Sequence, residues 1–169
     1  LSRKIDGNFP ESINVGVTQA TIDVCDNPTP ETLYEAKFSV QHCVSVAMLG
    51  GKIVFDSFEA EARRLTATLN RKITLHCDEK FEQRYPEAWG ADIKAEMKDG
   101  NVIMAHRNHA KGDPEAPLSP KEMKEKAMML FAHAEIEEPL KWIEKILCIH
   151  HGNSSFSEND FYQLLNLKD

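Results

Sequence analysis

The sequence predicts an α+β fold, in which strands and helices are grouped along the chain. A strand pattern near the N-terminus is followed by two helical patterns, then by three further strand patterns, and the chain ends in helices. Alternating α/β folds instead interleave a helix with each strand. With 169 residues, of which 41% are hydrophobic and 28% charged, the chain has the size of one globular domain and can bury a core.

The first strand is expected over residues 13–24, where apolar residues recur with a period near two, as on a half-buried strand. An interruption at Gln19 and Ala20 indicates a bend. The turn-forming residues of segment 26–30 then end the strand.

A long helix is predicted from Pro30 to about Leu49. Thr29 and Pro30 suit the cap and the first turn, and an apolar stripe at helical spacing follows. Gly50 and Gly51 end the helix because glycine permits positive φ. A second helix is expected over residues 59–69, capped by Asp56 or Ser57.

Three strands are predicted next, over residues 71–78, 92–97 and 101–106, because apolar and polar residues alternate in each. Asp99 and Gly100 form a two-residue turn signal between the last two strands. We therefore expect these two strands to form an antiparallel hairpin.

The C-terminal part is predicted to be helical. Ser119 and Glu122 form a capping box, with Pro120 at the first helical position, so a helix begins there. Two more helices are expected over residues 140–149 and 160–167.

Composition excludes several classes of protein. The net charge of -7 is unsuited to nucleic acid, which needs a positive surface that releases counterions. No apolar stretch approaches the roughly 18 residues of a membrane-spanning helix. The four cysteines lie far apart without a C-x-x-C pair, which favours a reducing cytoplasm. Because Leu1 rather than Met begins the chain and no apolar run follows, we expect a piece of a longer protein without a secretory signal.

Two sets of motifs, in this order and approximate spacing, resemble one family. Residues 35–42 read E-A-K-F-S-V-Q-H and are followed by A-M-L-G-G at 47–51. Asp99-Gly100 is followed by K-G-D-P at 111–114 and P-L-S at 117–119. Together they resemble the E-A-K/R-x-S-x-Q-Y and D-G … G-D-P-x-x-P-L-S patterns of MmgE/PrpD proteins.

The resemblance implies the smaller, C-terminal domain of a two-domain enzyme. Such a domain has an antiparallel sheet of about four strands with helices packed on it, here residues 1–135. Residues 136–169 would form a helical return segment that packs on an all-helical domain outside this chain. The family implies a 2-methylcitrate dehydratase-like lyase of propionate metabolism, or a decarboxylase or epimerase. Its reaction removes a proton next to a carboxylate without metal or organic cofactor, in a homodimeric protein.

Four residues are candidates for a site facing the polycarboxylate substrate. His42 stands where the family pattern has Tyr, and imidazole can donate a hydrogen bond or become cationic near neutral pH. The competing interpretation is a partly buried histidine satisfied by neighbours. The second candidate, Lys37, is expected either to bind a carboxylate of the substrate or to pair with Gln41. Gln41 itself is the third candidate. Arg107 lines the cleft edge or ends a solvated hairpin.

A metal site is the weaker possibility. His106 and His109 lie three residues apart, but a third ligand would have to come from His133 or from His150 and His151, which are distant in sequence. The alternative function is a non-catalytic α+β module that binds a small molecule or a partner, which nothing in the chain excludes. Without the resemblance, the sequence indicates only a soluble α+β domain, because no other catalytic motif is present.

Overall fold

The computed structural model describes residues 9–50, 52–150, 157 and 159. The chain divides into two compact units, residues 1–116 and 117–169. The sequence placed a boundary between residues 135 and 136, about one helix later. The helix that begins at Pro120 packs against the helix that follows it.

The first unit begins with strand β1 (Ser12–Val17), which helix α2 (Gln19–Cys25) follows directly. The prediction of a strand as far as residue 24 is therefore wrong in its second half. The Thr18 side chain accepts a hydrogen bond from the backbone N–H of Thr21, and this cap starts a helix. The alternation of apolar residues in this half does not reflect a buried strand face, since Val24 is 63% exposed.

Four strands form a single sheet in the order β2-β1-β3-β4, with β2 (Ile73–Cys77), β3 (Ala91–Glu96) and β4 (Val102–Arg107). β1 pairs with β3 and β3 with β4 in antiparallel directions, whereas β1 and β2 are parallel. The α+β class is confirmed, and the sheet is mixed, mostly antiparallel.

The predicted hairpin is confirmed as β3 and β4. Its turn holds three residues, 98–100, between Met97 and Asn101, one more than predicted. Met97 O accepts a hydrogen bond from Gly100 N, and Gly100 has a φ of 81°. A turn closed by a glycine in the left-handed region is the usual three-residue hairpin.

The predicted long helix is two helices, α3 (Leu33–Lys37) and α4 (Val40–Gly50). Ser39 separates them: its hydroxyl donates to the carbonyl of Asn27 and accepts from the backbone N–H of His42. Such a side chain satisfies the first turn of α4 and replaces a continuous helix. The cap at Thr29 was wrong as well, because Thr32 caps α3 through a capping box with Glu35.

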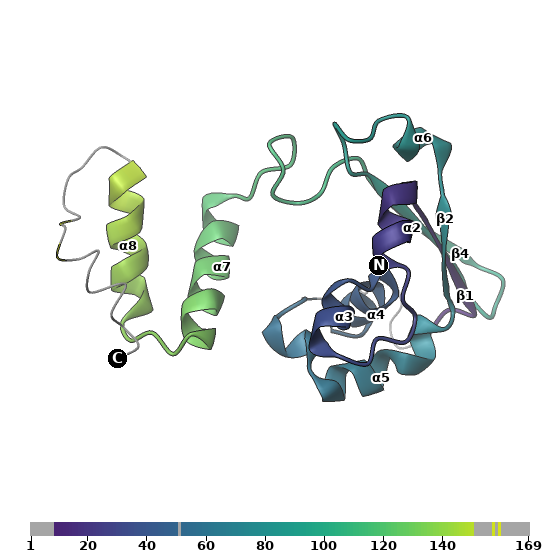
Figure 1. Ribbon diagram of the computed structural model, residues 1–169, viewed down its shortest axis with the longest axis horizontal. Helices are drawn as coiled ribbons and strands as arrows, with labels where there is room; N and C mark the ends of the chain where they lie inside the picture. The colour runs from purple at the N-terminus through teal and green to yellow at the C-terminus, as the bar shows by residue number, and fades with distance from the viewer. Residues whose placement is uncertain (1–8, 51, 151–156, 158, 160–169) are drawn as a thin grey trace. The chain divides into compact units, whose positions relative to one another are not determined.

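The second predicted helix is confirmed as α5 (Ala60–Asn70), which follows a short 3-10 helix, η1 (Phe55–Phe58). The predicted caps Asp56 and Ser57 lie within η1, and Glu59 occupies the cap position of α5. In Figure 1, α3, α4 and α5 lie together at one side of the sheet. The hydrophobic core between these layers contains residues of β1, β2, β3, α4 and α5: Ile13, Val15, Val17, Met48, Leu69, Ile73 and Ala95.

The opposite face of the sheet is polar. Side chains on a strand alternate between faces, so the neighbours of Val15 and Val17 on β1 point away from this core. Gly16 lies there, and the register places it beside His76 on β2 and Asp92 on β3. A short helix, α6 (Glu79–Glu82), follows β2 and starts at the capping side chain of Asp78.

The second unit contains helices α7 (Pro120–His133) and α8 (Pro139–His150), which pack together. The capping box of Ser119 and Glu122 is confirmed, with Pro120 in the first turn. Trp142 and Ile143 of α8 are buried. The helix predicted over residues 160–167 lies outside the described residues.

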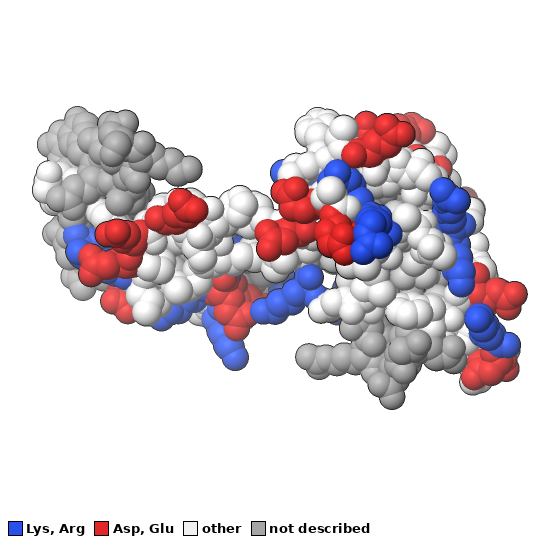
Figure 2. Space-filling view, turned by 90° about the horizontal axis from the view of Figure 1, so that it is seen from below, with Lys and Arg blue, Asp and Glu red and all other residues white. Residues whose placement is uncertain are grey.

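On the face seen in Figure 2, acidic and basic side chains are interspersed and form no continuous basic patch. Within the described residues, no helix combines the length and apolar character needed to cross a membrane.

Candidate functional site

His42, the first predicted site residue, is fully buried between α4, α5 and η1, with an exposed fraction of 0%. Its Nε2 lies 2.7 Å from the carbonyl oxygen of Ser57 and its Nδ1 lies 2.9 Å from Thr66 Oγ1. A carbonyl only accepts, so Nε2 donates to Ser57. In the neutral ring Nδ1 is an acceptor for the Thr66 hydroxyl, whose Oγ1 also lies 3.1 Å from a second acceptor, the carbonyl oxygen of Arg63. Both ring nitrogens are thus engaged, and no atom of His42 is open to a ligand in this arrangement.

Burial also sets the charge of this imidazole. Desolvation lowers the pKa of His42 below its ordinary value, outweighing the hydrogen bond to Ser57, which acts in the opposite direction. The nearby Arg63 guanidinium lowers the pKa further. His42 is therefore neutral near pH 7.

The other predicted site residues fall into two groups. Gln41 is 1% exposed, and its Nε2 donates to Asp26 Oδ1. Lys37 ends α3 and Arg107 ends β4, and both are exposed. Among the described residues, no hydrogen bond joins any two of these four side chains. The structure therefore brings Gln41 and His42 together as consecutive buried residues of α4 and leaves the two cations at the surface.

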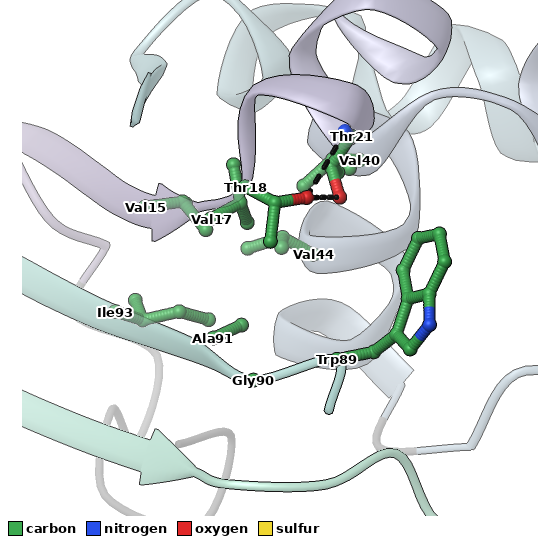
Figure 3. A pocket seen from close by; sticks show the side chains of 10 residues that line it. All are labelled: Val15, Val17, Thr18, Thr21, Val40, Val44, Trp89, Gly90, Ala91 and Ile93. Carbon is green, nitrogen blue, oxygen red and sulfur yellow. Dashed lines mark hydrogen bonds between the residues drawn. The ribbon is translucent and has the colours of Figure 1, made fainter. Parts of the chain in front are cut away.

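An apolar pocket of about 240 Å³ opens at the end of the sheet where β1 ends and β3 begins. Figure 3 shows its walls: Val15 and Val17 of β1, Val40 and Val44 of α4, and Ile93 of β3.

The pocket wall offers few polar groups to a ligand. Thr18 is buried, and its Oγ1 lies 3.0 Å from Thr21 Oγ1 and accepts from Thr21 N, so these hydroxyls satisfy each other (Figure 3). At the mouth, Trp89 is 50% exposed and contacts the Tyr85 ring edge-on. Such a pocket suits an alkyl group or a ring more than a charged one.

The two exposed candidates are carried by segments that border this pocket. Lys37 precedes Val40, a wall residue, by three positions. Arg107 pairs with Ala91, another wall residue, and its carbonyl oxygen lies 3.1 Å from the position that a Cβ on Gly90 would take. Each of these two cations therefore belongs to a segment that borders the pocket, Lys37 beside α4 and Arg107 beside β3.

A second cluster lies on the polar face of the sheet and consists of His76, Asp78, Lys80 and Asp92, called the charged cluster below. The ligand-type atoms of His76, Asp78 and Asp92 all lie within 4.8 Å of one another. Lys80 Nζ lies 3.1 Å from Asp78 Oδ2 and forms a closer ion pair with Asp92 Oδ2. These contacts join β2, α6 and β3 across the central strand β1.

The ammonium of Lys80 dominates the electrostatics of the charged cluster. Its hydrogen bond with Asp92 raises the pKa of Lys80. Desolvation alone would raise the pKa of Asp78, but the hydrogen bonds from Lys80 hold that pKa below its ordinary value. The Asp78 carboxylate and the Lys80 ammonium are therefore ionised near neutral pH.

Sequence reasoning missed the charged cluster, although part of the signal was present. Alternation placed His76 and Asp92 on the polar faces of their strands, but the pairing of β2 and β3 with opposite edges of β1 is not visible in local sequence. The pocket was missed because the predicted strand ran through Thr18 and Thr21.

Two of the histidines considered for a metal site, His106 and His109, contact other side chains. His106 Nε2 lies 2.9 Å from Asn108 Oδ1, an atom that also accepts from Arg84, and a second nitrogen of Arg84 lies 3.3 Å from His109 Nε2. Among the described residues, the only cluster with metal-ligand spacing is that of His76, Asp78 and Asp92. His151 lies outside the described residues.

Comparison with known proteins identifies the family. No curated protein matched the chain. The model of the MmgE/PrpD C-terminal domain matches residues 3–148, which is most of the 169-residue chain and includes both motif sets, the pocket and the charged cluster. The chain therefore belongs to the MmgE/PrpD family, whose members are generally enzymes, and comprises the C-terminal domain of that family.

Proposed function

We propose that this chain is the C-terminal part of a cofactor-independent lyase that removes a proton next to a carboxylate of a small polycarboxylate, as 2-methylcitrate dehydratases do. The observation that carries the proposal is the match of residues 3–148 to the C-terminal domain of the family. In this proposal, an all-helical domain outside the chain supplies the main acid and base. The enzyme acts as a homodimer in the cytoplasm.

The pocket supports a substrate that is partly apolar and partly anionic. Its walls are valine and isoleucine side chains, which suit the alkyl part of a methyl-substituted acid. The segments that border it carry Lys37 and Arg107, whose charges suit carboxylates. We infer that Arg107 and Lys37 meet the substrate from this side, and that Gln41 and His42 serve by holding α4, which forms one wall.

The isolated chain should be inactive. Stabilising the negative charge that develops on proton removal needs several preorganised donors, each worth about tenfold to a thousandfold in rate. Among the described residues, the side-chain donors in the pocket wall are two threonine hydroxyls that already bond each other and the indole N–H of Trp89. Beyond these and the two cations Lys37 and Arg107, we infer that the donors come from outside this chain.

The test is a proton NMR assay of the full-length protein that contains this chain, with 2-methylcitrate, citrate, cis-aconitate and iminodisuccinate as separate substrates. We expect one of them to be consumed by the full-length protein and none by the 169-residue chain alone. Consumption identifies the reaction, since dehydration, decarboxylation and epimerisation give different products.

Three variants at equal folded concentration then test the site. Arg107→Gln and Lys37→Gln should each raise KM about tenfold, the loss expected for one charge-assisted hydrogen bond. Lys98→Gln, an exposed lysine in the hairpin turn, is the matched control and should leave KM unchanged. An equal effect of all three variants would reject the placement of the substrate at this pocket. Binding of a tested acid by the full-length protein without any turnover would favour the non-catalytic module.

A further inference from the structure

The charged cluster has the donor set of a transition-metal site. His76 offers an imidazole nitrogen, and Asp78 and Asp92 each offer a carboxylate oxygen, with all three atoms within 4.8 Å of one another. In a tetrahedral zinc site with bonds of about 2.1 Å, neighbouring ligand atoms are about 3.4 Å apart. Small side-chain rotations at this half-exposed site therefore suffice to close the ligands around an ion.

The two carboxylates are already oriented by the backbone. Asp92 Oδ1 accepts from Gly16 N at 3.2 Å, and Asp78 Oδ1 accepts from Lys80 N at 3.0 Å. These bonds leave the Oδ2 atoms of both aspartates directed at one point. Outer hydrogen bonds of this kind fix the ligands of protein metal sites.

A cation already occupies that point in the structure. The ammonium of Lys80 contacts Asp78 Oδ2 and Asp92 Oδ2 together. The Lys80 side chain is 48% exposed, so its ammonium can move into solvent, giving up the two ion pairs and its contact with the Phe81 ring, whose centroid lies 4.6 Å from Nζ. The ammonium thus marks where positive charge is favoured, and it is replaceable.

Gly16 allows the side chains of neighbouring segments to lie directly over the central strand. A Cβ at this position would lie 2.5 Å from Asp92 Oδ1 and 3.2 Å from His76 Nε2. Any other residue here would project between the imidazole and the carboxylate. The absence of a side chain on the central strand therefore lets groups from β2 and β3 approach each other over β1.

We propose that His76, Asp78 and Asp92 bind a divalent transition-metal ion such as Zn²⁺, which takes the place of the Lys80 ammonium. One nitrogen and two oxygen donors suit Zn²⁺ and its neighbours, whereas Mg²⁺ and Ca²⁺ prefer all-oxygen sites. The bound ion would tie β2, α6 and β3 together. The site is separate from the proposed reaction and does not depend on it.

Isothermal titration of the 169-residue chain with Zn²⁺, in a buffer that does not bind zinc, tests the proposal. We expect one ion per chain. His76→Ala should weaken binding at least tenfold, because one of three protein ligands is lost. Lys80→Met keeps the stem and removes the competing charge, so it should tighten binding about tenfold.

Two further variants keep the test decisive if His76→Ala misfolds. Asp92→Asn preserves the side-chain shape and the bond from Gly16, and should weaken zinc binding as His76→Ala does. His133→Ala of α7 removes a histidine outside the cluster and should leave binding unchanged. The proposal is overturned if the wild-type chain binds no zinc, if the cluster variants and His133→Ala lose affinity equally, or if Lys80→Met binds no tighter than wild type.

Discussion

The first unit contains two polar groupings, each built around a histidine, and they differ in almost every other respect. The buried polar cluster joins α4, α5 and η1 and consists of Ser39, Gln41, His42, Ser45, Ser57, Thr66 and Asn70, all at most 7% exposed. The charged cluster lies on the other face of the sheet, where the Lys80 side chain is 48% exposed. In the first, nearly every donor meets an internal acceptor. In the charged cluster, opposite charges pair with one another at a site that is exposed to solvent.

The difference between the two clusters shows that burial, rather than residue type, decides whether a histidine stabilises the fold or is able to bind a ligand. A buried polar group is costly unless it is hydrogen-bonded, so His42 is held by Ser57 and Thr66 and stabilises the fold. His76 stands beside two carboxylates whose present partner, Lys80, can leave. The first histidine is therefore expected to matter for stability and the second for binding.

Among the substitutions that test this comparison, the largest change in stability is expected at His42. His42→Leu leaves the buried Ser57 carbonyl without its partner and removes the bond to Thr66, whose hydroxyl keeps the Arg63 carbonyl, and should lower the free energy of unfolding by about 3 kcal/mol. Urea unfolding measures it. The matched control, His76→Leu, should leave the urea midpoint nearly unchanged. Equal losses would show that the two histidines are not distinguished by enclosure.

A second, somewhat smaller effect is expected at Asn70, which is 1% exposed. In the amide orientation that satisfies its neighbours, its two N–H groups face three acceptors, Gln41 O, Ser45 Oγ and Thr66 O, which lie 3.2, 2.7 and 3.1 Å from the nitrogen. Asn70→Ala should cost about 2 kcal/mol of unfolding free energy. The exposed amide of Gln83, which bonds Glu79, is the control, and a cost for Gln83→Ala comparable to that of Asn70→Ala would contradict the distinction.

The pH dependence of stability sharpens the comparison further. The pKa of His42 is lower in the folded chain than its ordinary value near 6.5, so the unfolded chain takes up the proton first. Stability should fall as the pH drops below about 6.5, by at most about 1.4 kcal/mol per pH unit, and this dependence should stop below the folded pKa. Urea midpoints measured between pH 7 and pH 5 on wild type and on His42→Gln test this. If stability depends on pH equally in wild type and in His42→Gln, the dependence comes from titratable groups other than His42.

The smallest effect is expected at Lys80. Exposed ion pairs contribute little to stability because water and salt screen them and the side chains lose freedom. Lys80→Met should therefore leave the urea midpoint almost unchanged at low and at high salt, while changing zinc affinity as proposed above. A large loss of stability would mean that the charged cluster is structural, like its buried counterpart.

The parts of the fold that were predicted correctly have local causes. The hairpin follows from alternation and from Gly100, and α7 follows from the capping box of Ser119 and Glu122, both of which act within a few residues. Prediction failed where a single hydroxyl decides between two local structures. Thr18 turns a strand into α2, and Ser39 divides one helix into α3 and α4, yet neither is distinguishable in sequence from an ordinary polar residue.

The candidate site was harder to predict for a related reason. The family was identified from motifs in their order along the chain, and His42 was singled out by its place in one of them. Its burial depends on α5 and η1, which follow later in the chain, so no property of α4 alone reveals it. The charged cluster depends on register: His76 and Asp92 meet only because β2 and β3 flank the same residue of β1.

The position of β1 in the sheet has a consequence for how the chain folds as it is synthesised. β1 ends at Val17, but its two partners begin at Ile73 and Ala91, so it emerges early and has no strand to pair with until much more of the chain has appeared. Pairings between such distant segments form slowly, and the exposed strand edge is open to wrong partners in the meantime. The β3–β4 hairpin can form on its own first, and β1 then joins it, which makes closure of the central strand a late step in assembly.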